Sequence, residues 1–282
     1  AVDNGAGSRD LKLDVYQPTD FGVAVPNSRP TMMFIHGGGW RKGNKSLAES
    51  QGHTNPYVTR GYNLVSINYR HAKAIPPLTT GPADDYPLLE QLGDGKEHYE
   101  GVEGGLTTVI NASLEDANLA LDWIYANAAD YGFDTDRFAI LGSSAGAVNA
   151  MAMGHIVQNE NVDPKAIISN VGALFNETSP FTPGGPPTLL IAGETDNTVP
   201  AAWVELTREQ MNEVGIETEY YLKPNAGHRT DWETVIDGQT LRQHSFDFLY
   251  NHVATATVPE PTSALFLGCT GALACLRRRR RA

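Results

Sequence analysis

The amino-acid sequence predicts an α/β protein whose central, mostly parallel sheet carries helices on both faces. Short apolar runs alternate with segments of helical periodicity, and turn residues bound each run. Strands that are covered on both faces are apolar along their whole length, and these runs have that character. The chain has 282 residues, which is enough for one large core.

Six strands and four helices are expected. The strands are residues 31–36, 63–69, 137–142, 166–169, 188–192 and 219–222. The helices are residues 113–129, 145–157, 201–214 and 230–250. The first helix opens with a capping-box-like pattern, in which Asp116 follows Ser113 by three positions.

Residues 71–111 interrupt this alternation with a long segment that is rich in proline and acidic residues. A connection of this length is expected to be either a lid or a loop with short helices of its own. Its acidic residues lack the spacing of an EF-hand, so a solvated acidic surface is favoured over a calcium site.

Composition excludes several classes of protein. The formal net charge of -12 repels phosphates, so nucleic acid is not expected as a partner. The two cysteines, Cys269 and Cys275, both lie near the C-terminus. A disulfide framework or a cysteine zinc site is therefore excluded from residues 1–258.

One pentapeptide, residues 142–146, predicts a nucleophile. Its sequence Gly-Ser-Ser-Ala-Gly fits G-x-S-x-G, and it follows an expected strand and precedes an expected helix. A serine on such a sharp turn is exposed at the edge of the sheet, and the helix N-terminus behind it favours developing negative charge. Ser144 is the predicted nucleophile, because Ser143 occupies the first variable position.

A run of three glycines follows the first expected strand, in the sequence His36-Gly37-Gly38-Gly39-Trp40. Glycines let backbone N–H groups face a reacting oxygen without hindrance from side chains. Gly38 and Gly39 are therefore predicted to form an oxyanion hole together with the N–H of Ala145, and His36 is expected to hold the loop.

The acid and the base are expected after later strands. Asp196 lies just past the strand at 188–192, and His228 lies on a loop after the strand at 219–222. Glu194 is the rival acid, but it lies closer to the end of its strand. The chain order Ser144, Asp196, His228 is the order found in α/β-hydrolases.

These motifs resemble the α/β-hydrolase superfamily, and within it the esterases with a His-Gly-Gly-Gly motif. The resemblance covers nearly all of residues 10–252. Trp40 and the phrase at 68–70, Asn-Tyr-Arg, are similar to the branch of carboxylesterases, acetyl esterases and feruloyl-esterase-like proteins. The interval 167–196 is too short for a large cap domain at this point of the chain, so any cover of the site is expected from the N-terminal residues or from residues 71–111. This argues against lipase-like use of long acyl chains.

The resemblance implies a serine carboxylic-ester hydrolase that needs neither a metal nor an organic cofactor. Short-chain or carbohydrate-linked acyl esters, including acylated polysaccharides, are the expected substrates. The alternatives are a serine peptidase of the same fold and a catalytically silent surface protein with this fold. The peptidases usually carry a further large domain, and the intact Ser144, Asp196 and His228 argue against the silent protein.

The last residues form a separate segment. Pro259-Glu260-Pro261 precedes an apolar run at 262–276 and five arginines at 277–281. This order resembles the bacterial PEP-CTERM sorting signal. It implies export to the cell envelope or beyond, with a transient inner-membrane anchor that an exosortase-like protease removes. The expected division is a catalytic domain at 1–255 and a sorting tail at 256–282, with 262–276 in the membrane.

Overall fold

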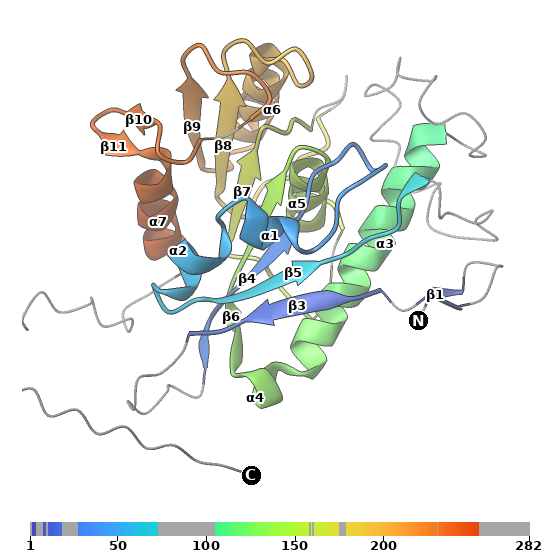
Figure 1. The fold of residues 1–282 in the computed structure, drawn as a ribbon. Helices are drawn as coiled ribbons and strands as arrows, with labels where there is room; N and C mark the ends of the chain where they lie inside the picture. Colours follow the sequence, from blue (N-terminus) through green and yellow to red (C-terminus); the bar gives the residue numbers. More distant parts are fainter. Residues whose placement is uncertain are drawn as a thin grey trace, which may run out of the picture.

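The computed structural model describes residues 2–3, 8–9, 11–18, 28–72, 105–157, 159, 161–174, 179–229 and 231–253. Its centre is a seven-stranded sheet of order β3-β5-β4-β6-β7-β8-β9 (Figure 1). The strands are β3 (Leu13–Tyr16), β4 (Arg29–Ile35), β5 (Asn63–Ile67), β6 (Phe133–Ser143), β7 (Ala166–Asn170), β8 (Thr188–Gly193) and β9 (Thr218–Lys223). The edge strand β3 is antiparallel to β5, and the remaining pairs are parallel. The predicted mostly parallel sheet is confirmed.

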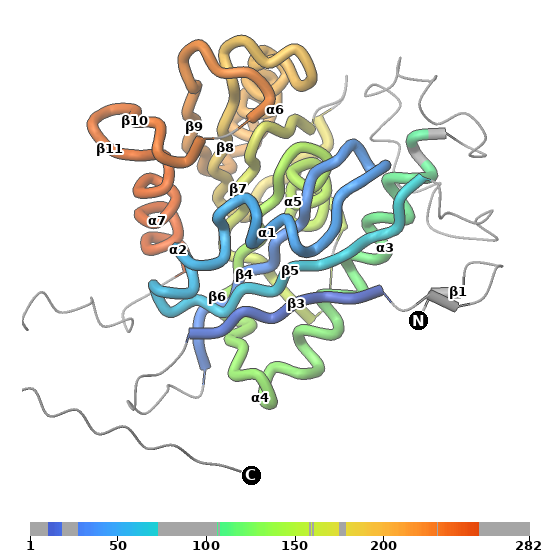
Figure 2. Tube along the Cα trace, in the orientation of Figure 1, coloured from blue at the N-terminus to red at the C-terminus, as the bar shows by residue number. Residues whose placement is uncertain are grey.

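Helices cover both faces of this sheet (Figures 1 and 2). The helices are α1 (Leu47–Ser50), α2 (Thr54–Val58), α3 (Gly105–Ala126), α4 (Ala128–Tyr131), α5 (Ala145–His155), α6 (Ala201–Glu213) and α7 (Leu241–His252). Side chains of α3, α5 and α6 form one hydrophobic cluster with the sheet, and side chains of α1, α2 and α7 form the other. The chain therefore builds two cores around one sheet.

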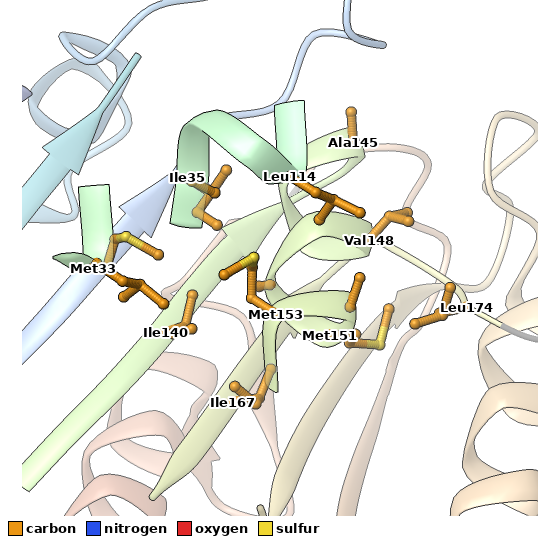
Figure 3. Packing of buried hydrophobic residues seen from close by; sticks show 14 of the residues in the cluster. Met33, Ile35, Leu114, Ile140, Ala145, Val148, Met151, Met153, Ile167 and Leu174 are labelled. Carbon is orange, nitrogen blue, oxygen red and sulfur yellow. The ribbon is translucent and has the colours of Figure 1, made fainter. Parts of the chain in front are cut away.

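Alternate residues of each central strand point to these two cores. In β4, Met33 belongs to the cluster that includes α5, whereas Met32 and Phe34 belong to the cluster that includes α7. This is the two-residue period of a strand. Figure 3 shows Met33 and Ile140 from the strands packed near Met153 of α5. Both faces are apolar, which explains the continuous apolar runs in the sequence.

The six predicted strands are all present, but two predicted helices have different bounds. The helix expected from residue 113 begins earlier, at Gly105. Ser113 therefore lies inside α3, where its hydroxyl donates to the Ile110 carbonyl at 2.7 Å and does not cap the helix.

Residues 105–111 consequently belong to α3 and not to the expected 71–111 insertion. Residues 73–104 lie outside the described part of the chain, so the expectation of a lid stays a prediction.

The helix expected over residues 230–250 is wrong in its first half. A hairpin of β10 (Val235–Ile236) and β11 (Gln239–Thr240) precedes α7. Its turn is Asp237-Gly238, and both residues have positive φ, +51° and +84°. This pair of left-handed residues is the turn that an Asp-Gly sequence favours between two strands.

The C-terminal tail lies outside the described residues. Within the described part of the chain, no helix is long and apolar enough to cross a membrane. The expected membrane segment at 262–276 therefore stays a prediction.

His53 is a buried titratable group in the α7-side core. It is 1% exposed, and its ring lies 4.7 Å from that of Phe34 and 5.3 Å from that of Trp232 between ring centroids. Burial lowers the pKa of His53 to about 3. In the unfolded chain the His53 imidazole binds a proton near pH 6.5, whereas in the folded chain it does so only near pH 3. The free energy of unfolding should therefore fall as the pH drops below 6.5 towards 3.

We therefore expect His53→Gln to flatten the pH dependence of the free energy of unfolding between pH 6.5 and 4. Each such histidine adds a slope of up to about 1.4 kcal/mol per pH unit. Urea unfolding at several pH values measures this slope. His252→Gln is the control, because His252 is only partly buried, and it should keep the slope of the natural chain. An equally steep slope in His53→Gln would contradict the assignment.

Candidate active site

Ser144 lies on a sharp turn between the end of β6 and the start of α5. Its backbone has φ +54° and ψ -122°, which a residue with a side chain rarely adopts. The turn is held by its own N–H, which donates to the Asn170 carbonyl at 2.8 Å. A Cβ on Gly142 would lie 2.0 Å from the Gly146 carbonyl oxygen, and one on Gly146 would lie 2.1 Å from the Ile35 carbonyl oxygen. Both glycines of the motif are therefore required by close backbone approaches.

Three side chains that are far apart in the sequence form one chain of hydrogen bonds. Ser144 Oγ lies 2.7 Å from His228 Nε2, and His228 Nδ1 lies 2.7 Å from Asp196 Oδ2. The other oxygen of Asp196 accepts from the N–H groups of Thr198 and Val199, at 2.8 and 3.0 Å. The Asp196 side chain is fully buried, whereas that of His228 is 26% exposed. The structure thus brings together the three residues that the sequence singled out.

The loops that carry the aspartate and the histidine lie against one another, at the ends of β8 and β9 (Figure 2). The Thr195 N–H donates to the Ala226 carbonyl at 2.9 Å. A Cβ on Gly193 would lie 2.4 Å from the Gly227 carbonyl oxygen, so only glycine allows this approach. The position of the histidine loop therefore depends on the position of the aspartate loop.

Glu194, the rival acid, has a different place. Its carboxylate accepts from the Asn225 N–H at 2.6 Å, and its side chain is exposed. Asn225 has φ +54°, so this bond braces a left-handed turn shortly before His228. Asp196, not Glu194, contacts the imidazole.

The glycine loop lies directly against the nucleophile. A Cβ on Gly37 would lie 3.1 Å from the Cβ of Ser144. Gly38 and Gly39 follow with positive φ, +128° and +59°. Ala145 is the first residue of α5, where helical N–H groups have no partner within the helix. The three predicted oxyanion donors thus belong to a loop and a helix end that meet at Ser144.

His36 lies at the start of this loop and is held by Tyr69. Its ring stacks on Tyr69, with 4.3 Å between centroids, and the Tyr69 hydroxyl donates to the His36 carbonyl at 2.9 Å. Burial lowers the pKa of His36 to about 4, so the ring is neutral at pH 7.

The sequence analysis missed a polar anchor on the other end of the glycine loop. The Trp40 indole N–H donates to Asn149 Oδ1 at 3.1 Å, and Asn149 Nδ2 donates to the Ser113 hydroxyl at 2.9 Å. Trp40 is 7% exposed, so its side chain lies in the core rather than at an open surface. The only sequence signal for this anchor is a single asparagine inside an apolar helix.

No group of three or more His, Cys, Asp or Glu side chains that could hold a metal ion occurs within the described ranges.

Two family models match parts of this chain. The BD-FAE family model matches residues 13–79 and 105–179, which together make up just over half of the chain. The model of the PEP-CTERM protein-sorting motif matches residues 257–281.

Two curated relatives cover part of the chain. Cholinesterase 2 of Branchiostoma lanceolatum is 32% identical over 152 residues, which are 53% of this chain and 37% of the relative. Carboxylesterase 1C of Rattus norvegicus is 29% identical over 237 residues, which are 82% of this chain and 36% of the relative. The chain thus spans little more than a third of the length of these relatives.

A solved structure has the same fold over almost the whole chain. The propionate-bound esterase Est2 of Thermogutta terrifontis has a TM-score of 0.62 and 21% identity, and the match covers 86% of this chain and 90% of that one. A sequence identity this low supports a shared fold and nothing more. The match to the family model shows the family as well, and the matched residues include the glycine loop and the turn at Ser144. The chain therefore belongs to the BD-FAE family of esterases and has the α/β-hydrolase fold.

Proposed function

We propose that this protein is a serine carboxylic-ester hydrolase that acts through Ser144, His228 and Asp196. The observation that carries the proposal is the unbroken chain of 2.7 Å contacts from Ser144 Oγ through the imidazole to Asp196 Oδ2. A serine hydroxyl is a weak nucleophile until a neighbouring base accepts its proton, and here the base lies within hydrogen-bond distance.

The first step is attack on the ester carbonyl. His228 Nε2 accepts the proton of Ser144, and Ser144 Oγ bonds to the carbonyl carbon. This requires the imidazole tautomer with its proton on Nδ1, which donates to Asp196. The buried carboxylate holds that tautomer and stabilises the imidazolium that forms. Thr198 and Val199 N–H groups hold the carboxylate in place.

The second requirement is a site for the negative oxygen of the tetrahedral intermediate. The N–H groups of Gly38, Gly39 and Ala145 are the proposed donors. His228 then gives its proton to the leaving alcohol, and an acyl-enzyme remains on Ser144. Water, deprotonated by the same imidazole, releases the acid and restores the serine. Every proton in this cycle passes through one residue, and no cofactor takes part.

The proposed substrates are short-chain or carbohydrate-linked acyl esters outside the cytoplasm. The short connection between β7, which ends at Asn170, and β8, which begins at Thr188, leaves no room for a large cap domain between these two strands. The match to the PEP-CTERM motif supports an envelope or extracellular location. Acylated polysaccharides are esters of that kind that an exported enzyme would meet.

Ser144→Ala should abolish turnover of p-nitrophenyl acetate, with a fall in kcat of about 10⁴- to 10⁶-fold, because no other group replaces the nucleophile. The control is Ser143→Ala, which removes the neighbouring hydroxyl that lies 3.2 Å from Asn170 Nδ2 and should retain kcat within about tenfold. Mass spectrometry after treatment with a fluorophosphonate should find the label on Ser144.

A panel of aminoacyl amides and acetyl esters, together with the fluorophosphonate, separates the alternative functions. Faster cleavage of aminoacyl amides than of acetyl esters would favour a serine peptidase. An unlabelled Ser144 in the folded natural chain would favour a silent protein and overturn the proposal.

Asp196→Asn and Glu194→Gln test which carboxylate is the acid. Asp196→Asn should lower kcat by about 10³- to 10⁴-fold, because an amide favours the wrong imidazole tautomer. Glu194→Gln should lower it by less than about tenfold, because an amide oxygen still accepts from the Asn225 N–H. Steady-state kinetics on one ester compares the two. Equal losses would argue against the assigned role of Asp196.

We further propose that residues 1–255 form the catalytic domain and that 256–282 form a sorting tail, with 262–276 spanning the inner membrane until an exosortase-like protease cleaves the tail. In a bacterium with such a protease, the full chain with Pro259→Ala and Pro261→Ala should stay in the inner-membrane fraction. Esterase activity per molecule should not change, because the catalytic residues are elsewhere. Fractionation and immunoblotting follow the release of the protein from the membrane. Release of the variant at the rate of the natural chain would contradict this role.

A further inference from the structure

A fully buried lysine lies at the base of the histidine loop. Lys223 is the last residue of β9, and its side chain is 0% exposed. Lysine is rarely buried completely unless its charge is partnered. The Lys223 ammonium donates a hydrogen bond to the carbonyl oxygen of Arg229, the residue directly after His228. The buried ammonium therefore closes the loop that carries the proposed base.

The charges around Lys223 belong to the same site. Burial lowers the pKa of Lys223, and the negative charges of Asp196 and Asp231 act in the opposite direction. Lys223 also pairs with Gly193 in the sheet, at the start of the loop that carries Asp196. One cation thus lies between the aspartate loop and the histidine loop.

Among the described residues, two other contacts hold the part of the loop that precedes His228. Glu194 braces Asn225 at the start of the loop, and the Thr195 N–H binds the Ala226 carbonyl before the histidine. The Lys223 contact holds the chain on the far side of His228. A loop pinned on both sides of its central residue keeps that residue's side chain within the small tolerance that proton transfer requires.

We propose that Lys223 is a positioning residue for His228. Its ammonium fixes the loop through the hydrogen bond to the Arg229 carbonyl. This inference rests on the proposed function, because it assigns His228 as the base and Asp196 as the acid. The ammonium contacts the backbone carbonyl next to His228, so its contribution acts through the orientation of the imidazole.

Three substitutions in the full chain separate the hydrogen bond of Lys223 from its charge. Lys223→Met removes the charge and the donor, Lys223→Gln keeps a donor without the charge, and Lys223→Arg keeps the charge. We expect Lys223→Met to lower kcat by about 10- to 100-fold and to leave KM within about threefold, because the base is misplaced while substrate binding is retained. Lys223→Arg should restore more activity than Lys223→Gln.

A spectroscopic measurement tests the imidazole itself. The proton that His228 Nδ1 shares with Asp196 has its own downfield ¹H NMR resonance, and we expect it to shift or broaden in Lys223→Met. Lys45→Met is the matched control, because Lys45 forms an ion pair with Asp14 at another part of the sheet. That control should keep both kcat and the resonance of the natural chain.

Thermal unfolding shows which variants are folded. If Lys223→Met does not fold, the kcat and the resonance of Lys223→Gln test the inference in its place. A folded Lys223→Met or Lys223→Gln variant with kcat within twofold of the natural chain and an unchanged resonance would overturn the inference. If the natural chain hydrolyses no ester, the proposed function fails. The resonance of His228 then still reports whether Lys223 positions the imidazole.

Discussion

The close approach of α5 to the strands beneath it determines where the candidate site can form. The Gly146 backbone lies so near the Ile35 carbonyl that a Cβ would be only 2.1 Å from that oxygen. This contact brings the start of α5 to the end of β4, and the glycine loop begins directly after β4. The left-handed Ser144 and the loop at Gly37 therefore meet as a consequence of helix packing. The strain at Ser144 persists because α5 is buried from Ala145 to Met153.

The two hydrophobic cores fix the strands and helices, but the chemistry lies on the loops that follow them. Apolar packing fixes the positions of strands and helices, but it does not fix the conformation of a polar loop that follows them. Apart from Trp40, whose side chain lies in the core, polar contacts hold the loops. The glycine loop uses Tyr69 and Asn149, and the aspartate loop uses the backbone N–H groups that bind Asp196.

Much of this arrangement was predictable from the sequence, because the signals are local. The buried strands are continuous apolar runs, and the turn at Ser144 needs small residues that a short motif displays. The chain order of the three site residues was also readable. The start of α3 at Gly105 was not, because the pattern at Ser113 resembles a cap although the helix has already begun. The Asp237-Gly238 hairpin carried a usable signal, and the helical periodicity that follows it concealed that signal.

Contacts between distant segments explain what remained hidden. Asn149 matters only because Trp40 and Ser113 face it from two other elements, and no spacing in the sequence links these three. Lys223 ends a strand as an ordinary polar residue would, and only the fold shows that its side chain is buried. A buried polar group is costly unless it is partnered, so its position reports a constraint that apolar patterns do not encode. Three such groups hold the loops around Ser144, because Tyr69, Asn149 and Asp196 each form a hydrogen bond with a loop that borders it.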